Sequence, residues 1–99
     1  MIIEMALDCP KFAVTKVEEK LVGWPLKNLV SFDVCQNKMT LTIKKLGTSI
    51  IEFNIEKSHE KLIFKKSKEK IALSHKAIRN VVESKLTEAV RSIEGKIYE

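Results

Sequence analysis

The side chains that could perform chemistry in this 99-residue chain include two cysteines and two histidines, namely Cys9, Cys35, His59 and His75. Together they offer the four donor atoms of a structural zinc site. Zinc modules usually supply their ligands as close pairs, whereas these four residues lie far apart in the sequence. We therefore expect no metal and no cofactor. In this interpretation Cys35 packs under a sheet, His59 lies in a solvated turn and His75 contacts a neighbour at a helix start.

Nucleophilic catalysis needs a base within hydrogen-bond reach of the nucleophile and a third group that orients the base. A cysteine and a histidine could supply the first two parts, but the spacing favours no particular pair. The sequence contains no nucleophile elbow, no phosphate-binding glycine loop and no paired-histidine metal motif, and it has only three glycines. These observations predict that the protein is not an enzyme.

The composition is typical of one small globular domain over residues 1–99. Hydrophobic residues make up 44% of the chain, charged residues 31%, and the formal net charge is +5. No apolar run reaches the roughly 18 residues that a membrane span requires, and the first residues lack the basic start of a secretory signal. We expect a cytoplasmic protein with reduced cysteines and no membrane association. The positive charge permits an anionic partner without requiring one.

Hydrophobic periodicity predicts an α+β fold that begins with a short strand and a helix. Residues 3–8 alternate weakly between apolar and polar types, and residues 11–22 carry one apolar helical stripe. Gly23 and Pro25 follow the stripe and are typical of a helix end.

The middle of the chain predicts an antiparallel meander of three to four strands. The expected strands cover residues 29–36, 39–44, 51–56 and 61–66. Asn37 and Lys38 are the expected hairpin turn between the first two, because asparagine tolerates positive φ. Residues 67–73 fit a loop, a strand or the first turns of a helix. A long amphipathic helix, capped by Ser74 and extending to Ile97, is expected to pack on one sheet face.

The C-terminal helix is the leading candidate for partner binding. It would be longer than a strand of ~20 Å can cover, so its apolar residues from about Leu86 onward are expected to overhang the sheet. The expected interface residues are Val90, Ile93, Ile97, Tyr98 and Trp24. We predict a binding or assembly module that forms a homodimer, or binds a protein partner, through this helix. The simpler alternative is that the whole stripe belongs to the core.

The basic segment 57–70 is the second candidate, for nucleic-acid binding. Its expected contacts are Lys61, Lys65, Lys66, Lys68 and Lys70. Such lysines can neutralise phosphates without reading sequence. Phe32, Phe53 and Phe64 could stack on bases if exposed together, but their aliphatic neighbours at period two are typical of a core face. A solvated lysine edge is the simpler interpretation, and a small apolar ligand held between helix and sheet is a third possibility.

The length and element order resemble those of the small proteins encoded with polyhydroxyalkanoate granule genes, which also run strand, helix, several strands and amphipathic helix. The similarity is one of layout, and it implies no role for any residue of this chain.

Overall fold

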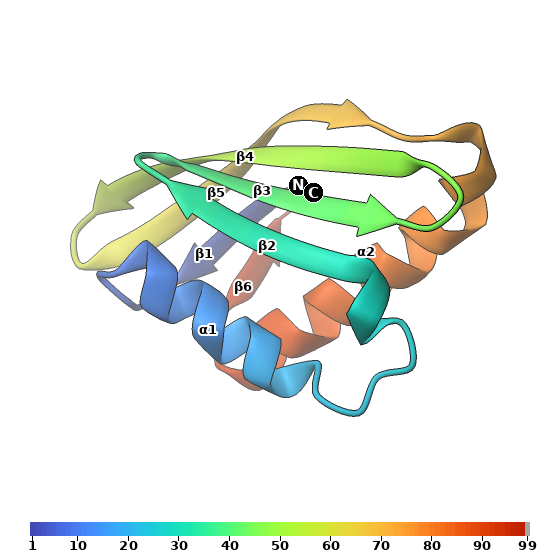
Figure 1. Ribbon diagram of the computed structural model, residues 1–99. Coiled ribbons are helices and arrows are strands. Elements are labelled where there is room, and N and C mark those ends of the chain that lie inside the picture. The colour runs from blue at the N-terminus through green and yellow to red at the C-terminus, as the bar shows by residue number, and fades with distance from the viewer. Residues whose placement is uncertain (99) are drawn as a thin grey trace.

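A six-stranded antiparallel sheet and two α-helices form the fold in a computed structural model that describes residues 1–98 (Figure 1). In chain order the elements are β1 (Ile2–Met5), α1 (Pro10–Lys20), β2 (Val30–Cys35), β3 (Lys38–Lys44), β4 (Thr48–Ser58), β5 (Lys61–Lys70), α2 (Lys76–Ser92) and β6 (Lys96–Tyr98). Two short 3₁₀ turns, η1 (Lys27–Leu29) and η2 (Leu73–His75), precede β2 and α2. The strand order is β2-β3-β4-β5-β1-β6. The first strand, β1, therefore lies between β5, the last strand of the meander, and the edge strand β6. The α+β class predicted from the sequence is confirmed.

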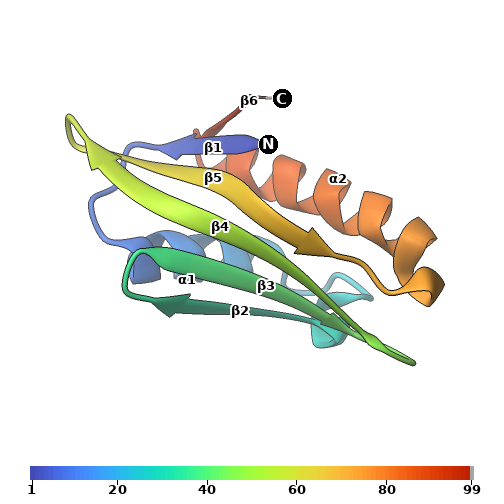
Figure 2. The same cartoon turned by 90° about the horizontal axis from the view of Figure 1, so that it is seen from above.

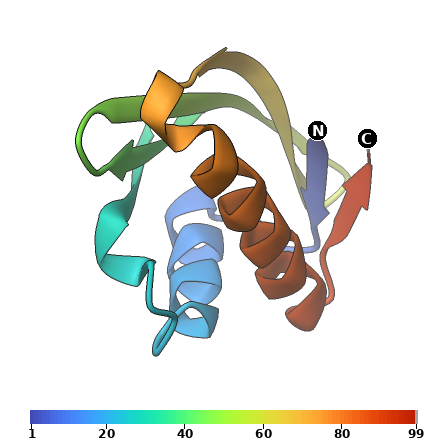
Figure 3. The ribbon, with the colours of Figure 1, turned by 90° about the vertical axis from the view of Figure 1, so that its right-hand side faces the viewer.

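Both helices lie on the same side of the curved sheet (Figure 3). Alternate residues of the strands point toward them, because successive side chains of a strand face opposite sides. The buried strand residues include Ile3, Met39, Leu41, Ile43, Ile51, Phe53, Leu62 and Phe64, and the helices add Ala13, Val17, Val82, Leu86 and Val90. The second face of the sheet carries no helix, as the view from above shows (Figure 2).

The two hairpins at either end of β4 close through residues with positive φ. His59 and Glu60, with φ of 48° and 64°, connect β4 to β5, and Leu46 and Gly47, with φ of 53° and 137°, connect β3 to β4. The β2–β3 hairpin differs slightly from the sequence prediction. Cys35 pairs with Lys38, so the turn consists of residues 36–37 rather than 37–38.

The C-terminal helix is shorter than the sequence predicts. It ends at Ser92, where the amide of Gly95 donates to the carbonyl of Val90 at 2.9 Å and the amide of Glu94 donates to that of Arg91 at 3.1 Å. These two bonds form a Schellman motif, with Glu94 in the left-handed region at φ 65°. A Cβ on Gly95 would lie 2.5 Å from Val90 Cγ1, so a glycine is needed at this close approach. The chain then turns back and pairs as β6 with β1.

Within residues 1–98, no helix is long and apolar enough to cross a membrane.

Candidate binding surfaces

The four residues considered for zinc are not brought together. Cys9 and Cys35 are both exposed, so the expectation that Cys35 packs under the sheet is wrong. Cys35 shares the open face with Asp33 and Ser31, which lie two and four residues earlier in β2. His59 lies in the exposed β4–β5 turn. The described residues contain no group of three or more ligating side chains that could hold a metal.

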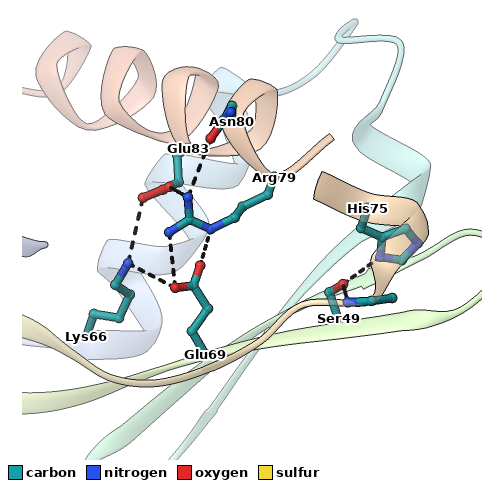
Figure 4. Close-up of polar contacts among 8 residues, drawn as sticks. Ser49, Lys66, Glu69, His75, Arg79, Asn80 and Glu83 are labelled. Atoms are coloured by element: carbon teal, nitrogen blue, oxygen red, sulfur yellow. Dashed lines mark hydrogen bonds and ion pairs between the residues drawn. The ribbon is translucent and has the colours of Figure 1, made fainter. Parts of the chain in front are cut away.

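His75 is completely buried, and both of its ring nitrogens are hydrogen-bonded. Figure 4 shows its contact with Ser49. Ser49 Oγ lies 2.6 Å from Nδ1, and the carbonyl oxygen of Lys45 lies 2.6 Å from Nε2. A carbonyl only accepts, so Nε2 carries the proton and donates to Lys45, while the Ser49 hydroxyl donates to Nδ1. Ser49 Oγ in turn accepts from the Ala72 amide at 2.8 Å. We call Ser49, His75 and their two backbone partners the histidine clamp.

The histidine clamp is a structural connection rather than a catalytic pair. It joins the β3–β4 hairpin to the segment that leads into α2, and every polar group in it has a partner. Ser49 is 0% exposed, so its hydroxyl cannot reach a substrate. The partners are 26 residues apart in sequence, and for that reason sequence analysis found only that His75 contacts some neighbour.

A cluster of ion pairs fastens α2 to β5 next to the histidine clamp (Figure 4). Arg79 binds the Glu69 carboxylate through both Nε and Nη2, and its Nη1 lies 3.0 Å from Glu83 Oε2. Lys66 adds a contact of 3.4 Å to Glu69 Oε2. The hydrogen bonds from Arg79 hold the pKa of Glu69 below its usual value, and the same bonds raise the pKa of Arg79. Glu69 and Arg79 therefore both stay ionised at neutral pH.

The five lysines of the basic segment do not form one free patch. Lys61 pairs with Glu4 at 3.1 Å, Lys65 pairs with Glu56 at 3.3 Å, and Lys66 belongs to the ion-pair cluster. Their charges are partly neutralised before any partner approaches.

Lys68 and Lys70 differ from the other three lysines. Both are exposed on the open face of β5, opposite Glu52 and Ile50 of β4, and neither forms an ion pair within the described chain. Phe53 and Phe64 are buried, so they cannot stack on bases.

The predicted overhang of the C-terminal helix is absent, and this changes the expected interface. Val90 is 0% exposed and belongs to the core, while Ile93 and Ile97 are partly buried against that core. Ile97 lies in β6, paired with Ile3, rather than on a helix. Tyr98 is 46% exposed on the open sheet face.

The exposed apolar side chain that α2 does offer is Val81, which sequence analysis missed. Val81 is 48% exposed, whereas its neighbour Val82 is buried. It lines a shallow, mostly apolar groove of about 380 Å³ together with Trp24, Asn80, Ser84, Lys85 and Glu88. The available signal was the Val81–Val82 pair, because consecutive helical residues point about 100° apart and only one of them can face the sheet.

Among residues 1–98, the cavity between the helices and the sheet is too small for an apolar ligand. The cavity between helices and sheet, lined by residues such as Met5, Phe32 and Leu86, measures only about 10 Å³. A cavity of that volume has room for about one water molecule.

Comparison with protein-family models, with curated proteins and with solved structures finds no match for this chain.

Proposed function

We propose that this protein is a non-enzymatic assembly module that forms a two-fold homodimer through the exposed flank of α2. The observation that carries the proposal is the apolar groove between Trp24 and Val81. Trp24 is partly buried on the α1–β2 loop, and Val81 is nearly half exposed on the helix. Tryptophan supplies a large contact area at low entropic cost, which is why it is enriched at the centres of interfaces.

The groove runs along a flank of α2 with small side chains and opposite charges. Ala77 and Ser84 are exposed on this flank and allow another helix to approach closely. Lys85 and Glu88 form an ion pair of 3.2 Å at its far end. In an antiparallel pair of α2 helices centred near Ser84, each Glu88 would lie opposite Asn80 of its partner, whose side-chain amide can donate to a carboxylate. A surface that carries both a donor and an acceptor can complement itself in this way, as a two-fold interface requires.

Trp24 provides a direct signal for the dimer, because it is the only tryptophan in the chain. Burial of its ring in an interface should shift its fluorescence emission to shorter wavelength as the protein concentration rises. Val81→Asp should abolish that shift, because it places a charge in the apolar groove. Val22→Asp is the matched control, since Val22 is 78% exposed on the α1–β2 loop and does not line the groove. An emission maximum that stays constant up to high micromolar concentration would contradict the proposal.

Nucleic-acid binding is the second candidate, and the free charges of Lys68 and Lys70 are what favours it. The exposed ring of Tyr98 lies on the same open face of the sheet and could stack on a base. This proposal expects oligonucleotide affinity that falls steeply with salt and is lost in Lys68→Gln/Lys70→Gln. A binding curve without salt dependence, or no binding at low salt, would remove this candidate.

A further inference from the structure

Two leucines project into solvent at one end of the molecule. Leu46, in the β3–β4 turn, is 91% exposed, and Leu73, in η2, is 84% exposed. The two segments touch, because Ser74 Oγ donates to the Leu46 carbonyl at 3.3 Å and a Cβ on Gly47 would lie 3.4 Å from Ala72 Cβ. Both segments occupy the same end of the fold in Figure 2. We call this end, formed by residues 44–48 and 72–76, the leucine tip.

Backbone geometry does not explain why Leu46 is a leucine. Its φ of 53° lies in the left-handed region, where glycine and asparagine are favoured and a leucine is unusual. Its side chain is almost entirely in water, so packing does not compensate for this conformation. An apolar side chain kept at such a position points to a role outside the folded core.

The leucine tip is also held in place. The histidine clamp ties the Lys45 carbonyl to His75, and the Lys45 amide donates to the Gly47 carbonyl at 3.1 Å. Leu46 and Leu73 therefore lie on two segments, the β3–β4 turn and η2, that hydrogen bonds hold together.

The leucine tip and the residues next to it in sequence carry only positive charges. Residues 42–51 and 70–82, which include the tip, contain no aspartate or glutamate. Four exposed lysines lie in the tip or close to it in sequence and form no ion pair among residues 1–98: Lys44, Lys45, Lys70 and Lys76. This one end thus carries a free positive charge comparable to the net charge of +5 of the whole chain.

We propose that the leucine tip docks on an anionic lipid bilayer, with Leu46 and Leu73 inserted between headgroups and the lysines bound to lipid phosphates. Two exposed leucines beside four lysines match the layers of an anionic bilayer. The lysines can bind the charged headgroups, and the leucines can enter the apolar region beneath them. A nucleic acid would use the lysines but has no apolar layer for the leucines, and the only ring in the tip, that of His75, is buried and cannot stack on a base. The proposal departs from the expectation of no membrane association, which rested on the lack of a spanning segment.

Cosedimentation with vesicles tests this proposal on the intact chain. Vesicles of phosphatidylcholine mixed with phosphatidylglycerol should bind the protein at low salt, whereas phosphatidylcholine alone should bind it far more weakly. Leu46→Asn combined with Leu73→Gln should weaken binding about tenfold or more, because two leucines lose their burial in the bilayer. Asparagine suits positive φ, so this variant keeps the fold, which a thermal melt checks. Val22→Asn removes an exposed apolar side chain elsewhere and should bind like the parent.

Two double variants with the same net charge distinguish binding through the tip from binding that depends only on the total charge of the protein. Lys45→Gln/Lys70→Gln should lose most of the binding, whereas Lys11→Gln/Lys57→Gln, with the same net charge and exposed lysines away from the tip, should keep it. No binding to the anionic vesicles at low salt would overturn the proposal. Equal binding by the leucine variant would overturn it too, as would tighter binding to an oligonucleotide that is indifferent to the leucines.

Discussion

The two hairpin turns at the ends of β4 both reverse the chain through residues with positive φ, but one uses polar side chains and the other uses an exposed leucine. The β4–β5 turn uses His59 and Glu60, which are exposed and polar and whose side chains form no hydrogen bond or ion pair among residues 1–98. The β3–β4 turn uses Leu46 and is tied to η2 through His75 and Ser74. A turn that only reverses the chain needs polar residues that tolerate positive φ. The β3–β4 turn has extra connections and an exposed leucine that chain reversal does not require, and these are the features on which the proposed bilayer contact rests.

The histidines give the largest expected contrast between the two turns. His75→Ala should lower the free energy of unfolding by about 2–4 kcal/mol, because it leaves a cavity and removes the partners of Ser49 and the Lys45 carbonyl. His59→Ala, in the exposed turn, should change it by less than about 0.5 kcal/mol. Urea unfolding followed by circular dichroism measures both variants. Equal effects would show that the histidine clamp does not hold the β3–β4 turn.

The ion pairs near the two turns should also contribute unequally to the free energy of unfolding. The pair near the β3–β4 turn should contribute more, but the difference should be smaller than for the histidines. Glu69→Gln should cost about 1–2 kcal/mol at pH 7, since Glu69 receives a bidentate Arg79 and its side chain is only 24% exposed. Glu56→Gln should cost less than about 0.5 kcal/mol, because Glu56 and Lys65 are each about half exposed. Chemical denaturation of the two variants beside the parent gives both values.

Acid should erase the difference between Glu69→Gln and the parent protein. The pKa of Glu69 is lower in the folded state, so its contribution is fully present above the unfolded pKa and is lost as the pH falls through the folded value. The unfolding free energies of parent and variant should therefore begin to converge as the pH falls through the unfolded-state pKa of about 4.3, and they should meet only below the lower folded-state pKa. A difference that stays constant down to pH 3 would mean that the Glu69 charge is not what the variant removes.

The smallest expected effect concerns Leu46 itself. Leu46→Asn should leave stability unchanged or raise it by about 0.5 kcal/mol, because asparagine accepts the left-handed conformation at lower cost. Thermal unfolding by calorimetry detects this change. A clear loss of stability would assign Leu46 a structural role and remove one support for the leucine tip.

Local periodicity was enough to predict most of the elements and failed where two periods coincide. Ile93 and Ile97 are four residues apart, a spacing that fits both a helical stripe and a strand with period two. The sequence prediction followed the helix through Gly95, whereas the structure uses this glycine to end α2 and start β6. The same error placed Val90 at an exposed interface instead of in the core.

The binding surfaces were harder to predict because they depend on contacts between distant segments. His75 finds Ser49 across 26 residues, and Leu46 meets the η2 segment only after the sheet has formed. Ion pairs changed the basic segment in a similar way, because Glu4 and Glu56 come from other strands to pair with Lys61 and Lys65. Of the interface residues predicted from the sequence, Trp24 is the one that lines the groove.

Self-association through the flank of α2 would double the mass of the protein, which light scattering after size exclusion measures. The parent and Val22→Asp should elute as dimers of the 11.3 kDa chain, independent of salt, while Val81→Asp should elute as a monomer with an unchanged circular dichroism spectrum. A parent protein that stays monomeric at high micromolar concentration, or a Val81→Asp variant that remains dimeric, would contradict the account.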